Sequence, residues 1–302
     1  MSVRPEMRAL AEAIWAAVAT EEVEPGSPAA LSAWRQGYDQ FGQELPLPPG
    51  TSVRRLMLGS RPGELVTVGG AEPTRLVVFV HGGGYIVGSP TSHRSFAAHL
   101  AATAGVAVLL PDYRLSPEVT YGSAVEDVVL AFEHMLANGW DERSVVLGGD
   151  SAGGGVALAV TMTLRDRGRP VPSGLVLLSP WADMTHLDHG SRVTYGDEPM
   201  YDRDFTHLMA NAVIGDGDPA DPLVSPVLGD FTGLPRILVH VGSVEAMRDD
   251  GERVVERARA AGVDATLRVW PGAGHNFQVF PSFFPQDSMA WSALRDIAAF
   301  VA

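Results

Sequence analysis

The feature that most constrains this 302-residue chain is the pentapeptide Gly149–Gly153, with the sequence GDSAG. A β-branched apolar run, Ser144–Gly148, precedes it, and a small-residue helical pattern, Ala152–Leu164, follows it. A Gly-x-Ser-x-Gly motif between a strand and a helix is typical of a nucleophile elbow, a sharp turn that projects the serine from the top of a sheet. The flanking glycines leave room for the strand and the helix to converge. The sequence therefore predicts Ser151 as a nucleophile, with a structural glycine-rich turn as the alternative.

Apolar runs of strand length alternate with helical patterns on both sides of this motif. Helices between successive strands impose parallel pairing with right-handed crossovers. The chain is therefore expected to form an α/β fold, with a mostly parallel central sheet and helices on both faces. Strands are expected at 53–58, 64–68, 75–80, 106–110, 143–148, 174–179, 236–241 and 265–270, and helices at about 92–104, 121–138, 152–167, 246–261 and 287–301.

Two segments fall outside this alternation. Residues 1–45 carry apolar and aromatic stripes at helical spacing and are expected to form one or two helices, packed either as core or as a cap over an active site. Residues 181–235 contain Asp, Gly, Pro and His, with a helical stretch near 202–213. This segment is long for a connector, so we expect a functional insertion.

Charge and composition exclude several classes of protein. The formal net charge is −14 at pH 7, which argues against binding to nucleic acid or to anionic membranes because both need cationic contacts. The chain has no lysine, which excludes lysine Schiff-base chemistry and a P-loop lysine, and no cysteine, which fits a cytoplasmic protein without disulfides. It has no apolar run near the ~18 residues of a membrane helix, and its first residues lack the layout of a signal peptide.

Two loops that follow predicted strands carry the partners that a serine nucleophile needs, because the carboxyl ends of parallel strands meet at one edge of a sheet. His275 lies in a glycine-rich loop after the strand at 265–270, where a histidine can take the serine proton and return it to the leaving group. An acid that holds the imidazole is expected after the strand at 236–241. Glu245 lies nearest to that strand and is favoured. Asp249 and Asp250 are the alternatives, with capping or solvation of a helix N-terminus as their other role.

A glycine run, His81–Gly84, follows the apolar strand at 75–80. Glycine N–H groups can approach a developing oxyanion with no side chain in the way, and losing one such donor typically costs roughly 3–4 kcal/mol of transition-state stabilisation. We expect the N–H groups of Gly83 and Gly84, with that of Ala152 after the nucleophile, to form an oxyanion hole. A phosphate-binding loop is the alternative, although no G-x-G-x-x-G opens the first βα unit.

Five motifs occur in one order along the chain: HGGG at 81–84, YRLSPE at 113–118, GDSAG at 149–153, SPWAD at 179–183 and GHNF at 274–277. Together they resemble the bacterial hormone-sensitive-lipase-like esterases of the α/β-hydrolase superfamily. This resemblance, over about residues 75–280, implies an α/β-hydrolase fold and hydrolysis of carboxylic esters, mostly with short acyl chains, through an acyl-enzyme and without a cofactor. It also implies a helical cap, so we expect an N-terminal helical cap segment at 1–45 and a catalytic domain at 46–302 with a cap insertion near 185–220.

The resemblance also bears on the acid and on assembly. The family usually has an aspartate followed by a proline in the acid loop, where this chain has Glu245 and Ala246. Glutamate is one methylene longer, so its loop is expected to lie slightly farther from His275. Many members dimerise through the edge of the last strand and its helix, so a homodimer is one expected assembly.

The sequence predicts a serine carboxylesterase that acts on a small-molecule ester of short-to-medium acyl length and has no metal site. A lactonase or an amidase with the same triad, and a non-catalytic ligand-binding relative, are the alternatives. Arg114 and Glu118 are expected to pair beneath the site, and Asp150 is expected to favour the N-terminus of its helix. Candidates for the apolar pocket walls, each with core packing as its other role, are Tyr85, Trp181, Tyr195, Met200, Phe205, Met209 and Phe277.

Overall fold

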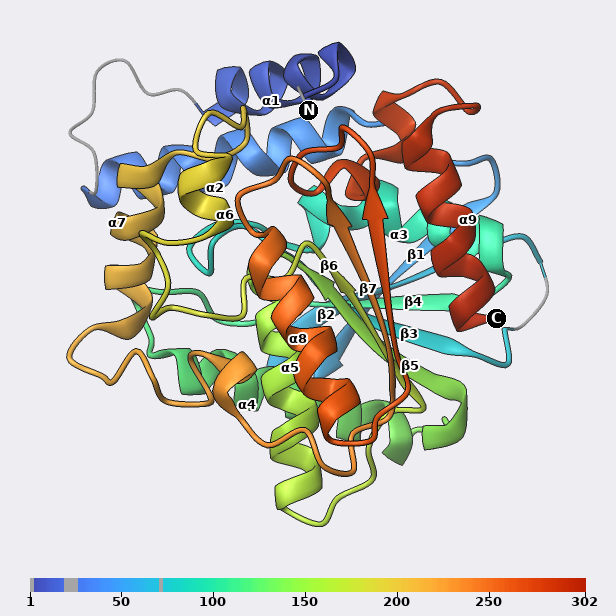
Figure 1. Cartoon of the computed structure of the whole chain (residues 1–302). Helices are drawn as coiled ribbons and strands as arrows, with labels where there is room; N and C mark the ends of the chain where they lie inside the picture. Colours follow the sequence, from blue (N-terminus) through green and yellow to red (C-terminus); the bar gives the residue numbers. More distant parts are fainter. Residues whose placement is uncertain (1–2, 19–26, 71–72) are drawn as a thin grey trace.

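The computed structural model describes residues 3–18, 27–70 and 73–302. Within these ranges the chain forms one eight-stranded sheet in the order β1-β2-β4-β3-β5-β6-β7-β8 (Figure 1). β2 pairs antiparallel with β1 and β4, and all other neighbours pair parallel, which confirms the predicted mostly parallel α/β sheet. The strands are β1 (Thr51–Leu58), β2 (Arg61–Val68), β3 (Leu76–Val80), β4 (Ala107–Pro111), β5 (Val145–Asp150), β6 (Gly174–Leu178), β7 (Arg236–Gly242) and β8 (Ala265–Trp270).

Helices cover both faces of the sheet (Figure 1). On one face lie α3 (Pro90–Ala104) and α9 (Met289–Val301), and on the other lie α4 (Tyr121–Ala137), α5 (Ala152–Asp166) and α8 (Arg248–Ala260). The central strands are apolar along their whole length because alternate side chains enter different cores. In β3, Val77 and Phe79 belong to the core beneath α3 and α9, whereas Val78 belongs to the core beneath α4, α5 and α8.

The strand order determines where a site can form. β3 lies between β4 and β5, so the chain winds away from β3 in both directions. The crevice at such a switch point, outside the carboxyl ends of the strands, is where α/β sheets bind ligands. The loops after β3, β5, β6, β7 and β8 all emerge at this carboxyl edge, because these strands are parallel.

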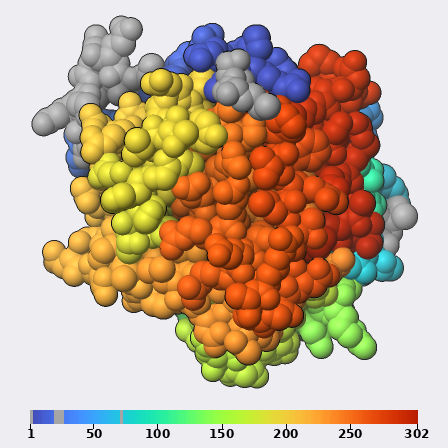
Figure 2. Space-filling view, viewed as in Figure 1, coloured from blue at the N-terminus to red at the C-terminus, as the bar shows by residue number. Residues whose placement is uncertain are grey.

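Two segments distant in sequence meet at the carboxyl edge. Trp15 and Trp34, from the first two helices, pack edge-on against Phe205. The Phe205 ring centroid lies 5.9 Å from that of Trp15 and 4.9 Å from that of Trp34. Figure 2 shows the yellow segment near residue 200 lying against the blue first helix at the surface. The helices that gather here are α1 (Pro5–Val18), α2 (Pro28–Glu44), the short α6 (Ser191–Thr194) and α7 (Arg203–Ile214).

Most predicted elements are present with shifted ends. β5 continues to Asp150, farther than predicted, because Asp150 pairs in register with Leu178 of β6. The helix predicted from residue 246 begins at Arg248. No helix within the described ranges is both long and apolar enough to cross a membrane. Short 3₁₀ helices lie at Glu142–Ser144, Pro226–Leu228, Phe277–Val279 and Pro281–Phe283.

The predicted pairing of Arg114 with Glu118 is wrong. Arg114 instead binds Asp127 of α4 through two hydrogen bonds of 2.8 Å. Glu118 accepts two hydrogen bonds, of 2.6 and 2.7 Å, from Arg35 of α2. Arg35 also donates to the carbonyl oxygen of Ile86 at 2.7 Å, so this ion pair ties α2 to the loop after β3. Arg114 and Glu118 are close in sequence but bind different helices, α4 and α2, and their spacing along the chain does not reveal this.

Candidate active site

Ser151 occupies a strained turn between β5 and α5. Its backbone has φ 49° and ψ −121°, a conformation that residues with a side chain rarely adopt and that clusters at functional sites. The turn is held by the Ser151 N–H, which donates to the carbonyl oxygen of Leu178 at 2.8 Å. A Cβ on Gly149 would collide with the carbonyl group of Gly153 in α5, and a Cβ on Gly153 would collide with the carbonyl groups of Val80 and His81 at the end of β3, which explains both glycines of the motif.

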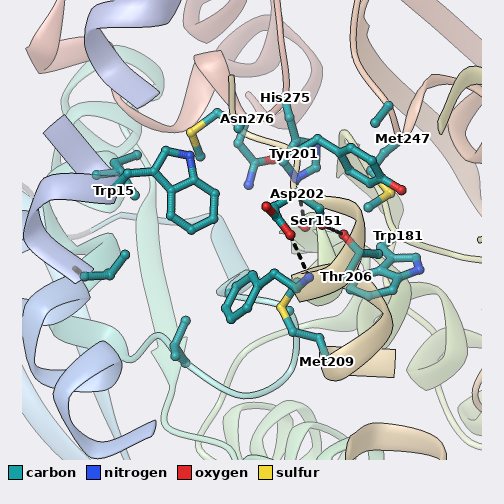
Figure 3. A pocket seen from close by; sticks show the side chains of 18 of the residues that line it. Trp15, Ser151, Trp181, Tyr201, Asp202, Thr206, Met209, Met247, His275 and Asn276 are labelled. Carbon is teal, nitrogen blue, oxygen red and sulfur yellow. Dashed lines mark hydrogen bonds between the residues drawn. The ribbon is translucent and has the colours of Figure 1, made fainter. Parts of the chain in front are cut away.

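His275 meets Ser151 from the loop after β8, residues 271–277, which we call the base loop. His275 Nε2 lies 2.9 Å from Ser151 Oγ (Figure 3). Desolvation on burial lowers the pKa of His275 to about 4; the Asp150 carboxylate opposes this shift, and the Arg192 guanidinium adds to it. The imidazole is therefore neutral, and able to accept a proton, at any pH well above 4.

Glu245 lies in the loop after β7, residues 243–247, which we call the acid loop. Its side chain is fully buried, and Oε2 accepts hydrogen bonds from the Gly242 N–H at 2.9 Å and from Ser179 Oγ at 2.8 Å. Ser179 Oγ in turn accepts from the Asn276 N–H of the base loop at 3.3 Å. Glu245 Oε1 and His275 Nδ1 are both buried and have no hydrogen-bond partner among the described residues. The structure therefore links Glu245 to the base loop through Ser179 and not through a direct hydrogen bond to the imidazole.

Asp249 and Asp250, the alternative acids, engage the segment that precedes α7. Asp249 Oδ2 accepts from the Ser191 N–H at 2.8 Å. Asp250 is fully buried, accepts two hydrogen bonds of 2.8 and 3.0 Å from Arg192, and also accepts from the Ala182 N–H at 2.9 Å. The expectation that Asp250 caps or solvates a helix end is wrong, because its carboxylate lies in a buried ion pair.

The glycine loop after β3 places N–H groups beside the nucleophile. Gly83 and Gly84 have φ of 114° and 58°, and both line the same cavity as the serine. The Gly83 carbonyl oxygen accepts from the N–H groups of Ile86 and Val87 at 3.1 and 3.0 Å, which curls the loop. In the described chain, no backbone hydrogen bond uses the N–H of Gly83, Gly84 or Ala152. Ala152 is the first residue of α5, where N–H groups have no partner within the helix, although it does not itself line the cavity.

The chain is similar to known hydrolases in sequence and in structure. Residues 77–279 match a protein family described as alpha/beta hydrolase fold. An acetyl-hydrolase of Streptomyces hygroscopicus is 38% identical over 242 residues, which are 77% of this chain and 81% of that protein. An esterase of Acinetobacter venetianus is 33% identical over 272 residues, 90% and 88% of the two chains. A crystal structure of an esterase from the bacterial hormone-sensitive lipase (HSL) family superposes with a TM-score of 0.91 at 35% identity, covering 100% of this chain and 98% of that one. The chain belongs to the HSL-like esterases.

A cavity of about 650 Å³ lies against Ser151 and His275 of this HSL-like esterase (Figure 3). Its size is within the range of small-molecule sites. Figure 3 shows Trp15 on one side of the cavity and Trp181 on the other, with the serine and the histidine between them. Within the described ranges, no group of three or more His, Cys, Asp or Glu side chains could hold a metal ion. Of the predicted wall residues the cavity is lined by Trp181, Met200, Phe205 and Met209, and α1 and α2 add Ile14, Trp15, Val18, Trp34 and Tyr38.

Three predicted wall residues do not line this cavity. Tyr85 is buried, and its hydroxyl donates to the carbonyl oxygen of Trp181 at 2.8 Å. Phe277 is fully buried in the core beneath α3 and α9. Tyr195 lies beside the start of α8, where its hydroxyl oxygen is 3.4 Å from Arg248 Nη1. All three were predicted as wall residues because they are aromatic. Whether such a side chain lines the cavity or packs elsewhere depends on tertiary packing.

Asp150, the residue before the nucleophile, connects the glycine loop to the base loop. Its Oδ1 accepts from the Gly82 N–H at 2.9 Å, and its Oδ2 accepts from Asn276 Nδ2 at 2.8 Å. His93 Nε2 of α3 lies 3.1 Å from Oδ1. Asp150 stands directly before Ser151, the N-cap residue of α5, so its favourable effect on that helix N-terminus stays a prediction, while its fully buried carboxylate engages these neighbours.

Glu198 is a residue of the site that the sequence did not reveal. It lies between α6 and α7, is 3% exposed and lines the cavity. Its Oε2 accepts from the Ala246 N–H of the acid loop at 2.8 Å, and its Oε1 accepts from the His275 N–H of the base loop. Burial raises the pKa of Glu198 to about 7, against the two hydrogen bonds, which lower it. Burial also raises the pKa of Glu245 well above its usual range, and the nearby Glu198 raises it further.

Proposed function

We propose that this esterase is a serine carboxylesterase for short-to-medium acyl esters, with Ser151 as nucleophile, His275 as general base and Glu245 as the acid of the triad. The observation that carries the proposal is the 2.9 Å contact between Ser151 Oγ and His275 Nε2 in a cavity that Gly83 and Gly84 also line. A hydroxyl beside a neutral imidazole, with free N–H donors at the same place, is the set of groups that acyl transfer needs.

In the proposed acylation step, His275 Nε2 takes the hydroxyl proton while Ser151 Oγ forms a bond to the ester carbonyl carbon. The carbonyl oxygen becomes an oxyanion, which accepts hydrogen bonds from the N–H groups of Gly83, Gly84 and Ala152. His275 then gives its proton to the alcohol oxygen as the carbon–oxygen bond breaks, and an acyl-enzyme is left. Water then gives a proton to His275 and attacks the acyl carbon, and the proton returns to Ser151 Oγ as the carboxylic acid leaves.

Glu245 acts in this proposal on the other nitrogen of the imidazole. When its Oε1 accepts a hydrogen bond from His275 Nδ1, two buried atoms that have no other partner among the described residues satisfy each other. A carboxylate in that place orients the ring and stabilises the imidazolium that forms during the reaction. Burial raises the pKa of Glu245 and so disfavours its charged form, whereas a positive charge on His275 during the reaction favours that form.

The composition of the cavity favours small neutral esters. Its carboxylates, Glu198, Asp202 and Asp204, make it acidic, and no arginine is among the described residues that line it. An ester with an anionic acyl or alcohol group would be repelled, while apolar groups would contact the tryptophan, phenylalanine and methionine side chains. The relative from Streptomyces hygroscopicus is named an acetyl-hydrolase, which supports a preference for short acyl groups.

We also propose that α1, α2 and the insertion near 185–220 form a cap on a catalytic domain at 46–302. Side chains of both capping segments, such as Trp34 and Phe205, line the cavity over the nucleophile, which supports this division. A cytoplasmic location, the absence of a cofactor and a homodimer stay predictions. β8 is the last strand of the sheet and has a strand neighbour on one side only among the described residues, which supports pairing of its outer edge with a second copy.

A series of p-nitrophenyl esters from acetyl to lauroyl tests the proposed function. We expect the highest kcat/KM with the shortest acyl groups and a loss of about a million-fold in kcat for Ser151→Ala, because triad members act as a unit. A serine-directed phosphonate should label the wild type and not this variant. Ser52→Ala is the matched control, since Ser52 is exposed on β1, far along the chain from the site.

Two outcomes would contradict the proposal. A wild-type protein that hydrolyses no ester and is not labelled at Ser151 would be a ligand-binding relative that has lost its chemistry. Faster turnover of a lactone or an amide than of any ester in the series would identify a lactonase or an amidase with the same residues.

A further inference from the structure

Three segments meet around the carboxylate of Glu198: the cap segment that carries it, the base loop and the acid loop. Its two oxygens accept from the N–H groups of His275 and Ala246, which belong to the two loops, and its side chain is buried among them. We propose that Glu198 is a positioning residue that sets the spacing between base and acid, so that the cap completes the triad. This inference rests on the proposed function, because it assigns Glu198 a role in the same reaction.

The two loops are joined mainly at their ends near the sheet. Ser243 N–H donates to the Trp270 carbonyl oxygen at 2.9 Å, and Val244 N–H donates to the Ala273 carbonyl oxygen at 3.2 Å. Farther from the sheet, where His275 lies, side chains of other segments join the two loops. Ser179 joins the loops from β6, as described above, and Glu198 joins them from the cap.

In this proposal, Glu198 controls the distance between the base loop and the acid loop, and the triad depends on that distance. Glu245 Oε1 and His275 Nδ1 have no hydrogen-bond partner in the described part of the chain, and each belongs to one of the two loops. The separation of the loops therefore decides whether these atoms form a hydrogen bond. A misplacement of about 1 Å from a change away from the reacting atoms can lower a rate by about a hundredfold.

The cap segment is itself anchored, so that it can transmit its position to the loops. Glu198 N–H donates to the Tyr195 carbonyl oxygen at 2.9 Å, and the Tyr201 N–H donates to the Glu198 carbonyl oxygen at 3.0 Å. Trp15 Nε1 of α1 donates to the carbonyl oxygen of Pro199 at 2.6 Å. Glu198 also lines the substrate cavity, so a substrate that shifts this segment shifts the base and the acid with it.

The base loop has no room beside this carboxylate. A Cβ added to Gly274 would lie 2.7 Å from Glu198 Oε1, and the three atoms nearest to it all belong to Glu198. An alanine at this position must therefore displace either the carboxylate or the base loop. In a variant without the carboxylate, the same alanine should fit.

The first experiment compares Glu198→Ala, Glu198→Gln and Asp197→Asn with the wild type. We expect Glu198→Ala to lower kcat for p-nitrophenyl acetate about tenfold to a hundredfold, with KM changed less than about threefold, because the small substrate is bound but the base is misplaced. Labelling of Ser151 by a small phosphonate should slow by a similar factor. Glu198→Gln should regain part of the loss, because its amide oxygen still accepts one of the two hydrogen bonds. Asp197→Asn removes an exposed carboxylate one residue away and should match the wild type.

The second experiment introduces Gly274→Ala into the wild type and into Glu198→Ala. We expect about a tenfold loss of kcat in the wild type and no further loss in the variant, since the clash is with Glu198 alone. Circular dichroism and thermal unfolding establish that each variant is folded. If Glu198→Ala does not fold, Glu198→Gln takes its place in the first experiment, and Glu198→Asp, whose shorter side chain withdraws the oxygen from Gly274, takes its place in the second.

The outcomes separate this inference from the proposed function. A wild type without ester hydrolysis or phosphonate labelling overturns both. An active wild type with a folded Glu198→Ala that keeps its kcat, or that changes only in KM, overturns the positioning role alone. Additive losses from Gly274→Ala and Glu198→Ala would also overturn it, because they would show that the two residues act separately.

Discussion

The two halves of the proposed active site are held in place in different ways. The nucleophile half comprises Ser151 and the glycine loop, at the ends of β5 and β3. Its buried carboxylate is Asp150, which accepts from the Gly82 N–H of the loop after β3, lies beside His93 of α3 and also accepts from Asn276 of the base loop. Apart from Asn276, these partners belong to the sheet and the helix that covers it, so the nucleophile half depends mainly on the central α/β fold.

The base–acid half comprises the base loop and the acid loop, and two buried carboxylates beside these loops connect it to the cap insertion near 185–220. Glu198 reaches from the cap to the N–H groups of His275 and Ala246. Asp250 reaches from α8 to Arg192, in an ion pair that is about 1% exposed on both sides. Breaking a buried pair of this kind typically costs about 3–5 kcal/mol, so the cap insertion near 185–220 is tied to this half, whereas Arg35 ties α2 to the loop after β3.

This difference implies a division of roles. In the proposed mechanism, the nucleophile is prepared mainly by the fold, whereas the relation between base and acid depends on the position of the cap insertion. Displacement of this insertion should therefore weaken the base and the acid and leave the strained turn at Ser151 intact. Variants confined to one half should separate these effects.

The largest effect expected from a variant of the base–acid half alone is that of Glu245→Ala. We expect kcat for p-nitrophenyl acetate to fall about ten-thousand-fold, because the imidazolium loses its buried counter-charge and the ring loses its orientation. Asp249→Asn is the matched control and should stay within about threefold of the wild type, since Asp249 contacts the backbone of Ser191 and not the base loop. The opposite ranking of the two variants would reassign the acid to Asp249.

A smaller effect is expected from the nucleophile half in Asp150→Ala. The Gly82 N–H and the Asn276 amide lose their acceptor, and each buried donor without a partner costs about 1–3 kcal/mol. We expect the free energy of unfolding, measured in urea, to fall by about 2 kcal/mol or more. We expect kcat to fall about tenfold to a hundredfold as the glycine loop loses its anchor.

Asp150→Asn is the matched control for this variant. Asn276 Oδ1 has no partner among the described residues, so a turn of its amide can accept a hydrogen bond from the new side chain. The asparagine variant should therefore keep most of the stability and activity that the alanine variant loses. Equal losses in both would mean that the carboxylate charge, and not its hydrogen bonds, holds the glycine loop.

The same difference explains how much of the molecule could be predicted from the sequence. The sheet follows from apolar runs that alternate with helical patterns, and the nucleophile half follows from two glycine motifs. Each motif carries its glycines within about five residues, and they are a local signal for a tight strand–turn–helix unit. The contacts behind this signal are not all local, because the Ser151 N–H donates to Leu178 and a Cβ on Gly153 would meet the carbonyl oxygens of Val80 and His81. The motif was sufficient for the prediction because its residue types alone indicate this geometry.

The base–acid half could be predicted only in part, because its determinants are distant in sequence. His275 and Glu245 follow strand ends, which indicates their edge of the sheet. The partners of Glu198, in contrast, lie 48 and 77 residues away, and those of Asp250 lie up to 68 residues away. No period or motif in a single sequence pairs them. The same limit applies to Tyr85, which was predicted to line the pocket but is buried in the core.

The smallest effect, and the most informative about the base–acid half in solution, is the dependence of activity on pH. Catalysis needs neutral His275, so activity is lost as the pH falls through the pKa of its imidazole. Burial lowers that pKa to about 4. We expect kcat/KM to be level from pH 8 to about pH 5, about half at pH 4 and about a tenth at pH 3. Tryptophan fluorescence at each pH, and full recovery of activity on return to pH 7, exclude acid unfolding as the cause.

The midpoint of this profile reports the relation between base and acid. An ionised carboxylate hydrogen-bonded to His275 Nδ1 would favour the charged imidazole and raise its pKa. A midpoint near the ordinary value of 6.5 would therefore contradict the expectation of a midpoint near pH 4, and would mean that Glu245 is ionised and bonded to the imidazole before substrate binds. A midpoint near pH 4 would mean that the two loops come close enough for a hydrogen bond between Glu245 and His275 only during the reaction. In that case the nucleophile half is ready in the free enzyme, and the base–acid half is not.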